Sequence, residues 1–170
     1  NIATNAGGIK VLRYGLTREW VGGLEVVTGN GHHLSLNHGL VKNATGIDQR
    51  HLFVGSEGIL GFTSAAWMKL TEAPQPLRVM LLAVPSMRIA LSVLSVCQGH
   101  LNLTAFEFFS REALMHVRDH LSLTAPLSDA PFYVLCEFEQ IKGAEAGLSD
   151  AADIYAKLSE KSWVTDGVIA

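Results

Sequence analysis

The stretch Gly55-Ser-Glu-Gly-Ile-Leu-Gly61 decides the fold expected of this chain, because it places three glycines within seven residues ahead of an apolar run. A second glycine-rich stretch, Asn1-Ile-Ala-Thr-Asn-Ala-Gly-Gly8, stands at the first residue of the sequence. Glycine has no Cβ, so a ligand can approach the main chain closely and N–H groups can be directed at phosphate or carbonyl oxygens. Two such stretches on either side of a strand-rich region predict one elongated ligand that contacts both. Because a domain does not naturally begin inside a ligand loop, we expect the chain to be a piece of a longer protein.

Composition narrows the class of protein. The 170 residues allow one ordinary domain or two small ones, and the hydrophobic content of 48% is enough for a real core. The net charge is −3 and no basic stripe is present, so no nucleic-acid partner is expected. No apolar run approaches the roughly 18 residues of a membrane-spanning helix, and no transmembrane segment is expected.

Cysteines and histidines give no sign of a metal site. Cys97 and Cys136 are the only cysteines, and both stand in apolar surroundings that predict buried free thiols in a reducing compartment. We therefore expect a cytoplasmic protein, or a mitochondrial-matrix protein if the source is eukaryotic. His116 and His120 are spaced to share a helix face, and an exposed helix flank is favoured there over a metal pair.

Residues 1–75 are predicted to be rich in β-strands and to form the first of two domains. Gly29-Asn-Gly31 is a turn signal between the two strands of a hairpin. Pro74-Gln-Pro76 interrupts both hydrogen bonding and helix, and marks the boundary. The expected elements are strands at Val21–Thr28, His33–Asn37 and Leu60–Leu70 and a short helix at Ile47–Phe53.

Residues 76–170 follow a different pattern, in which strands alternate with helices. Ser86 and Ser110 precede helices as N-caps, and Gly99 is expected to end the first of these. Alternation with Phe138 predicts that Glu137 and Glu139 lie on a solvated strand face. The expected strands are Leu77–Val84, Leu101–Phe109, Phe132–Phe138 and Trp163–Ile169, with a third helix at Ala144–Lys161. The order β-α-β, extra helix, β-α-β is the split βαβ pattern of ferredoxin-like folds, so the predicted fold class is α+β.

Several polar or aromatic positions have two interpretations each. Glu57 either accepts hydrogen bonds from a ribityl or ribose hydroxyl or bonds nearby backbone N–H groups and fixes the turn. Tyr14, which follows Arg13, either lines the site or simply packs. For Asp48 a helix cap is favoured over a catalytic acid. For Glu107, pairing at the sheet surface is favoured over facing a cleft.

Together these stretches resemble the second part of the FAD-binding domain of the vanillyl-alcohol-oxidase superfamily, and within it the D-2-hydroxyacid dehydrogenases. In residues 1–75 the resemblance is carried by Asn1–Gly8, Arg13–Gly15, Gly23–Thr28, Asn43–Gly46 and Leu52–Gly61. In residues 76–170 the stretches Ala105–Phe109, Ala130–Leu135 and Val164–Gly167 resemble the D-2-hydroxyglutarate dehydrogenase group in particular. The resemblance covers essentially the whole chain. It implies the C-terminal part of a PCMH-type FAD-binding domain in residues 1–75, followed by the N-terminal part of a ferredoxin-like cap domain in residues 76–170.

The resemblance also implies a reaction and a cofactor. The full protein would bind FAD noncovalently and oxidise a D-2-hydroxyacid, with D-2-hydroxyglutarate to 2-oxoglutarate as the expected reaction, by hydride transfer from C2 to flavin N5. Electrons would pass to an acceptor protein or a quinone, and a homodimer is compatible with the family. This chain has Ile59 where the family usually has Thr, so a hydroxyl contact is lost there while main-chain contacts survive. The family's FAD contacts carry over onto Thr4, Asn5, Ala6, Gly7, Glu57, Gly58, Ile59, Leu60, Gly61, Phe62 and Thr63.

Further family elements would lie outside this sequence. The resemblance implies a pyrophosphate-binding loop before Asn1, and divalent-metal ligands and substrate-binding basic residues after Ala170. No catalytic residue and no metal ligand is therefore assigned to this chain. D-lactate or glycolate oxidation is the alternative within the enzyme class. A non-catalytic FAD-domain subunit or assembly module is the alternative outside it.

Overall fold

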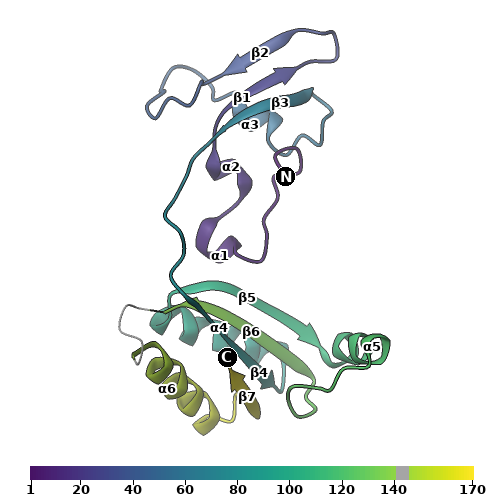
Figure 1. The fold of residues 1–170 in the computed structure, drawn as a ribbon, viewed down its shortest axis with the longest axis vertical. Helices are drawn as coiled ribbons and strands as arrows, with labels where there is room; N and C mark the ends of the chain where they lie inside the picture. Colours follow the sequence, from purple (N-terminus) through teal and green to yellow (C-terminus); the bar gives the residue numbers. More distant parts are fainter. Residues whose placement is uncertain (141–145) are drawn as a thin grey trace. The chain divides into compact units, whose positions relative to one another are not determined.

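The computed structural model describes residues 1–140 and 146–170 and shows two compact units (Figure 1). Unit 1 comprises Asn1–Ala73 and unit 2 comprises Pro74–Ala170. Both are mixtures of helix and antiparallel sheet, so the predicted α+β class is confirmed.

Unit 1 is built on a three-stranded antiparallel sheet in the order β2-β1-β3. The predicted hairpin is confirmed, since Thr28 N donates to His32 O at 2.9 Å and Gly31 takes a φ of +81° in the turn. Leu24 and Val26 of β1 are fully buried and pack with Phe53 and Val54 in a small core. The elements are β1 (Val21–Val27), β2 (His33–Leu36), β3 (Phe62–Met68), α1 (Val11–Tyr14), α2 (Thr17–Trp20) and α3 (Arg50–Phe53).

Three details of unit 1 differ from the prediction. The helices α1 and α2 were not predicted, because four residues are too few to show a helical periodicity. The strand β3 begins at Phe62 and not at Leu60, because Glu57 and Gly58 take left-handed φ values of +53° and +84° and form a turn. The helix α3 begins at Arg50 and not at Ile47, and the Asp48 carboxylate precedes it.

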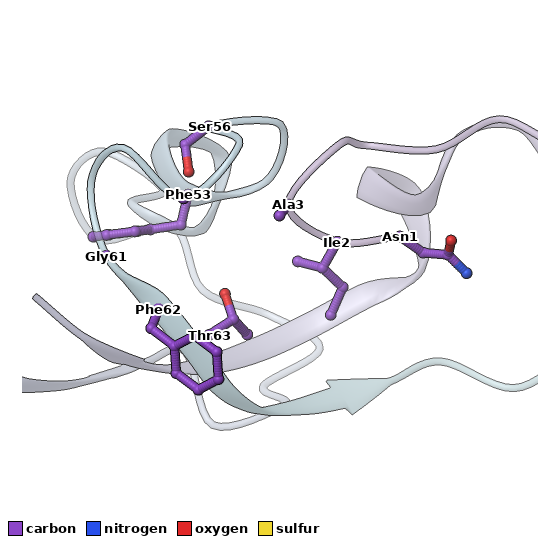
Figure 2. A pocket seen from close by; sticks show the side chains of 9 residues that line it. Asn1, Ile2, Ala3, Phe53, Ser56, Gly61, Phe62 and Thr63 are labelled. Atoms are coloured by element: carbon purple, nitrogen blue, oxygen red, sulfur yellow. The ribbon is translucent and has the colours of Figure 1, made fainter.

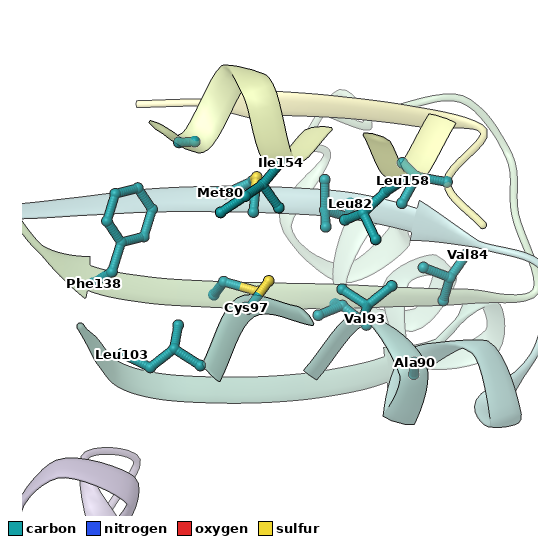
Figure 3. Close-up of a cluster of buried hydrophobic side chains, with 14 residues drawn as sticks. Met80, Leu82, Val84, Ala90, Val93, Cys97, Leu103, Phe138, Ile154 and Leu158 are labelled. Carbon is teal, nitrogen blue, oxygen red and sulfur yellow. The ribbon is translucent and has the colours of Figure 1, made fainter. Parts of the chain in front are cut away.

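Unit 2 has the ferredoxin-like topology that the split βαβ pattern predicted. Its four strands are antiparallel neighbours in the order β5-β6-β4-β7, and each βαβ half contributes one helix to the same core. Figure 3 shows Val93 and Cys97 of α4 and Ile154 and Leu158 of α6 around the core side chain Leu82 of β4. The strands are β4 (Leu77–Val84), β5 (Leu103–Ser110), β6 (Phe132–Glu139) and β7 (Asp166–Ile169), and the helices are α4 (Met87–His100), α5 (Arg111–Leu121) and α6 (Ala146–Glu160).

The N-caps predicted for unit 2 are present. The Ser86 hydroxyl accepts from Ile89 N and the Ser110 hydroxyl accepts from Ala113 N, each at 3.3 Å. These bonds satisfy donors that a helix otherwise leaves without a partner in its first turn. Gly99, by contrast, does not end α4, which continues to His100.

Two strands of unit 2 start later than predicted, since β5 begins at Leu103 and not at Leu101, and β7 begins at Asp166 and not at Trp163. Trp163 was predicted to start the last strand, but Trp163 N donates to Leu158 O at 3.0 Å and so closes the end of α6. Ser162 before it takes a left-handed φ of +57°, which is a common way to end a helix. Positions 144 and 145 of the predicted third helix lie outside the described residues.

The prediction that Glu137 and Glu139 lie on a solvated strand face was wrong. Glu139 is only 7% exposed, and its carboxylate accepts from Asn102 Nδ2 at 2.5 Å. Glu137 is half-buried and accepts from the hydroxyl of Thr104 at 2.5 Å. A register shift in β5 between Leu103 and Ala105 presents the buried Thr104 to Glu137. Alternation in the sequence correctly placed Glu137 and Glu139 on one face of β6. It could not show that Thr104 and Asn102 contact them there.

The two cysteines are buried free thiols in the core of unit 2, as predicted. Cys97 comes from α4 and Cys136 from β6, and their thiols are hydrogen-bonded. This bond and burial raise the pKa of Cys136, so its thiol is neutral. Both residues act as small core side chains.

Two glycines of unit 2 make a matched test of its packing. A Cβ on Gly167 in β7 would lie 2.6 Å from Tyr155 Cε2 and 2.9 Å from Leu82 Cδ2, whereas a Cβ on Gly99 would meet no atom within 4 Å. We expect Gly167→Ala to lower the free energy of unfolding by about 1–3 kcal/mol through overpacking. Gly99→Ala, inside α4, is expected to raise it by about 0.5–1 kcal/mol. Urea denaturation measures both, and equal effects of the two substitutions would contradict the packing described here.

Candidate functional site

The two glycine-rich stretches lie side by side in unit 1. Gly55 N donates to Ile2 O at 3.0 Å, and Glu57 N donates to Ala3 O at 2.8 Å. Gly55 has a φ of +85°, and a Cβ there would lie 3.2 Å from Asn5 Cβ. The absence of a side chain at this position lets the two segments meet, so residues far apart in the sequence form one surface.

A pocket of about 350 Å³ opens between these segments (Figure 2). Ile2 and Ala3 belong to the first segment, whereas Ser56, Phe62 and Thr63 come from the turn and strand of the second. Its size falls within the range of small-molecule sites. The lining residues are Asn1, Ile2, Ala3, Phe53, Ser56, Gly58, Gly61, Phe62 and Thr63.

Gly58 and Gly61 line the pocket for different physical reasons. Gly58 has a φ of +84°, and a Cβ there would meet no protein atom within 4 Å. At Gly61 a Cβ would instead lie 2.8 Å from both Val26 Cγ1 and Val27 O of β1. Gly58 therefore keeps main chain accessible from the pocket, while Gly61 is required by the packing of the strands.

The other predicted contact residues lie outside the lining, and three of them make hydrogen bonds within the first segment or to α2. Thr4 Oγ1 donates to Asn1 O at 3.3 Å, and Ala6 O accepts from both Thr17 N and Thr17 Oγ1. Asn5, with a left-handed φ of +48°, uses its side chain inside the protein, where Oδ1 accepts from Arg18 N at 2.9 Å. Predicted residues outside the lining are Thr4, Asn5, Ala6, Gly7, Glu57, Ile59 and Leu60, and those within it are Gly58, Gly61, Phe62 and Thr63.

Five lining residues were not in the predicted set. Asn1, Ile2 and Ala3 belong to the same glycine-rich stretch as the predicted Thr4–Gly7, so the stretch itself was the available signal. Ser56 lies inside the second stretch, and Phe53 lies two residues before it. Phe53 is a buried member of the core of unit 1, a role that the sequence could not connect with a pocket.

Tyr14 packs inside unit 1, whereas the side chain of Glu57 is exposed. Tyr14 is in edge contact with Trp20, with ring centroids 6.1 Å apart, and its carbonyl accepts from Trp20 Nε1 at 2.5 Å. Tyr14 therefore packs within unit 1 and does not line the pocket. The Glu57 side chain is exposed and, among the described residues, has no hydrogen-bond partner, so it does not fix its own turn. It is available to an external ligand.

Asp48 has a structural role in unit 1, whereas Glu107 is exposed on a strand of unit 2. Asp48 Oδ1 accepts from Arg50 N at 3.2 Å and from Arg50 Nε at 2.8 Å, while Arg50 Nη1 donates to Val21 O at 2.7 Å. Asp48 thus fixes the start of α3 against β1, but the predicted cap was wrong in its residue, because the N-cap of α3 is Gln49, which makes no side-chain cap bond. Glu107 is exposed on β5.

The chemistry of the pocket is defined by small, apolar and main-chain groups. None of its lining side chains is acidic or basic, and Ile2, Phe53 and Phe62 supply apolar surface. A phosphate would find no cationic side chain here, whereas a flat ring or a polyol chain would find apolar contacts and main-chain donors.

Residues 1–140 and 146–170 contain no group of three or more His, Cys, Asp or Glu side chains that could hold a metal ion. No helix in the same residues has the length and apolar composition to cross a membrane.

Residues 73–170 match the family described as FAD linked oxidases, C-terminal domain. The chain belongs to this family. The match covers all of unit 2 and begins ten residues after Thr63, the last lining residue of the pocket in unit 1. FAD is the cofactor that membership of an FAD-linked oxidase family implies.

Two relatives match over the whole chain, and a third matches over three quarters of it. The chain is 50% identical to D-2-hydroxyglutarate dehydrogenase of Xanthomonas citri pv. viticola and 48% identical to D-2-hydroxyglutarate dehydrogenase of Stutzerimonas stutzeri, in each case over 100% of this chain and 36% of the relative. It is 34% identical to glycolate oxidase subunit GlcD of Bacillus subtilis over 75% of this chain and 27% of that protein. The chain therefore spans about a third of the length of the two D-2-hydroxyglutarate dehydrogenases.

A solved structure supports the fold. Alkyldihydroxyacetonephosphate synthase matches with a TM-score of 0.66 and 22% identity, over 94% of this chain and 31% of that one. At this identity the likeness concerns the fold alone.

The pocket fits part of the cofactor that this FAD-linked oxidase family implies. The open space at Gly58 and the apolar side chains of Ile2 and Phe62 suit the neutral portions of FAD, namely its ring system and ribityl chain. The pyrophosphate needs donors or cations beyond those of this lining.

Substitution of Gly61 tests whether this glycine is required for the stability of unit 1 in the absence of a ligand. We expect Gly61→Ala to destabilise unit 1 by about 1–3 kcal/mol even without a ligand, because its Cβ would crowd Val26 and the Val27 carbonyl. Gly8→Ala is the control, since a Cβ there would have no atom within 4 Å. Thermal unfolding of the ligand-free protein measures both, and an unchanged midpoint for Gly61→Ala would show that the strands tolerate a side chain there.

The Asp48–Arg50 pair predicts a pH dependence of stability. Hydrogen bonds from Arg50 hold the pKa of Asp48 below its ordinary value. A lowered folded-state pKa means that the stabilisation is present above about pH 4 and is lost as pH falls through the folded-state pKa. Because Asp48 is 40% exposed, we expect Asp48→Asn to cost only about 0.5 kcal/mol at pH 7, and less at pH 3. Urea titrations at both pH values check this, with Glu72→Gln as control. A loss as large at pH 3 as at pH 7 would contradict it.

Proposed function

We propose that the protein to which this chain belongs is an FAD-dependent dehydrogenase that oxidises a D-2-hydroxyacid, with D-2-hydroxyglutarate as its substrate and 2-oxoglutarate as product. The observation that carries the proposal is 50% identity, over the whole chain, to a protein named D-2-hydroxyglutarate dehydrogenase. The glycine pocket of unit 1 supports it, because it offers a site of suitable size and chemistry for the cofactor.

In this proposal unit 1 holds FAD through main chain and apolar surface. The main chain at Ser56 and Gly58 approaches the cofactor closely, while Ile2 and Phe62 cover its apolar parts. Glu57 is placed to accept a hydrogen bond from a hydroxyl of the cofactor, since its carboxylate is exposed beside the pocket. FAD, when bound, supplies the two-electron acceptor for oxidation of the alcohol.

Two exposed apolar side chains, Ile59 and Phe62, favour exclusion of water from the bound cofactor. Ile59 and Phe62 are 85% and 72% exposed, and both belong to the segment that carries the pocket. Exposed apolar side chains at a pocket lose contact with water when a ligand covers them, which favours binding. The lining contains no titratable side chain, so the base that receives the proton of the C2 hydroxyl is proposed to lie outside this pocket.

The remaining parts of the proposal concern the whole protein. An acceptor protein or a quinone would receive the electrons, and the metal ligands and the residues that bind substrate carboxylates would lie outside this sequence. A homodimer is compatible with the proposal. The proposed compartment is the cytoplasm, or the mitochondrial matrix in a eukaryote, where the free thiols of Cys97 and Cys136 would stay reduced.

A pair of glycine substitutions tests cofactor binding in the full-length protein. We expect Gly58→Val to abolish retention of FAD, because a branched side chain at a φ of +84° is strained and would occupy the pocket. Gly46→Val is the matched control, because Gly46 has a similar φ of +68° and equally open surroundings but does not line the pocket. The flavin absorbance of the purified variants gives the result. Normal flavin content in Gly58→Val, or an equal loss in both variants, would refute the assignment of this pocket to FAD.

Substrate preference separates the proposed function from its alternative. Relatives named glycolate oxidase subunit and putative D-lactate dehydrogenase favour glycolate or D-lactate as the second candidate. A site with a cation for a distal carboxylate leaves that charge unpaired when D-lactate binds, so we expect kcat/KM for D-2-hydroxyglutarate to be higher by about 100-fold or more. Anaerobic dye-reduction assays with both D-acids and their L-enantiomers measure it. Equal turnover of D-lactate would favour the second candidate, and activity with L-acids alone would overturn both.

A further inference from the structure

We infer that Arg18 is a positioning residue that holds the two glycine-rich segments in the arrangement that binds the cofactor. This inference rests on the proposed function for its ligand, but the contacts on which it is built belong to the protein alone. Arg18 lies in the short helix α2, and it is not among the residues that line the pocket.

Arg18 contacts both segments of the site at once. Its guanidinium Nη2 donates to Val54 O at 3.1 Å, immediately before Gly55, and its main-chain N donates to Asn5 Oδ1 at 2.9 Å. Val54 is buried, whereas Asn5 is partly buried. A hydrogen bond from a charged donor is stronger than one between neutral groups. One residue therefore contacts both the start of the second segment and the middle of the first.

Gly55 allows the close approach of Asn5 beside this contact. A Cβ on Gly55 would lie 3.2 Å from Asn5 Cβ, which is a crowded distance, whereas its 3.6 Å distance from Arg18 Nη2 is an ordinary van der Waals contact. The glycine therefore lets Asn5 lie against the main chain that follows Val54. Thr17, adjacent to Arg18, donates to Ala6 O through both its N and its Oγ1, at 3.1 and 2.8 Å. The start of α2 thus anchors successive residues of the first segment.

The position of these contacts relative to the pocket gives Arg18 its role. The main-chain bonds Gly55–Ile2 and Glu57–Ala3 follow directly on the Arg18–Val54 bond along the second segment. Ile2, Ala3 and Ser56 line the pocket, so a shift of either segment changes its shape. Loss of the guanidinium would leave the main-chain bonds as the direct link between the two segments. Arg18 therefore acts on the cofactor through the main chain and not by touching it.

The first test measures, without any cofactor, how far Arg18 holds the two segments together; this set of Arg18 contacts to Val54 and Asn5 is called the clamp below. Hydrogen exchange of the full-length apoprotein is compared for wild type, Arg18→Met, Arg18→Lys and the control Arg88→Met, which removes an exposed arginine of unit 2. We expect the amides of Gly55 and Glu57 to exchange on the order of tenfold faster in Arg18→Met, with partial rescue by lysine, which keeps a charged donor. Exchange within twofold of wild type would overturn the clamp.

The second test measures the consequence for the cofactor. We expect the dissociation constant of FAD, followed by flavin fluorescence, to rise by on the order of tenfold in Arg18→Met, by less in Arg18→Lys and not at all in Arg88→Met. The unfolding midpoint of each apoprotein is measured alongside. Faster exchange with wild-type FAD affinity would show a purely structural contact and overturn the positioning role. Absence of FAD binding in the wild type would refute the proposed function itself, and the exchange experiment would still decide whether the clamp exists.

Discussion

The main-chain hydrogen bonds between the two glycine-rich segments are the contacts on which the candidate site depends. Gly55 N–Ile2 O and Glu57 N–Ala3 O join residues that are more than 50 positions apart in the sequence, and the pocket opens directly beside them. Main-chain bonds of this kind require that the segments approach without intervening side chains, which Gly55 permits. A binding surface made of main chain tolerates changes of side-chain identity, so Ile59 does not by itself argue against a cofactor here.

The glycines of the chain serve several physical purposes, and only some of them concern a ligand. Gly61 and Gly167 are required because a Cβ would enter neighbouring protein atoms. Gly58 has open space around its Cβ position, a left-handed φ and, unlike Gly46, a place in the pocket lining, which together suit the approach of an external molecule to the main chain. A glycine-rich motif therefore mixes folding constraints with binding constraints, and the atoms near each missing Cβ identify the glycines that packing requires.

The sequence predicted the elements that depend on local signals and missed those that depend on tertiary contacts. The caps Ser86 and Ser110 and the order of strands and helices in unit 2 follow from side-chain chemistry and periodicity, and all were found. The burial of Glu139 depends on Asn102, whose proximity no local pattern reveals. Both glycine-rich segments that the sequence singled out contribute residues to the pocket, and their contact with a cofactor stays a prediction. The sequence could not tell that Asn5 would turn its side chain toward Arg18 while Asn1–Ala3 lined the pocket.

The central claim is that the two glycine-rich segments together form a wall of an FAD site. A crystal structure of the full-length protein with FAD bound tests this most directly. The account predicts that FAD contacts the main chain at Ser56 and Gly58, and the side chains of Ile2 and Phe62, at van der Waals distances of about 4 Å. An FAD molecule bound elsewhere, with the pocket between Ile2 and Phe62 open to solvent, would contradict it.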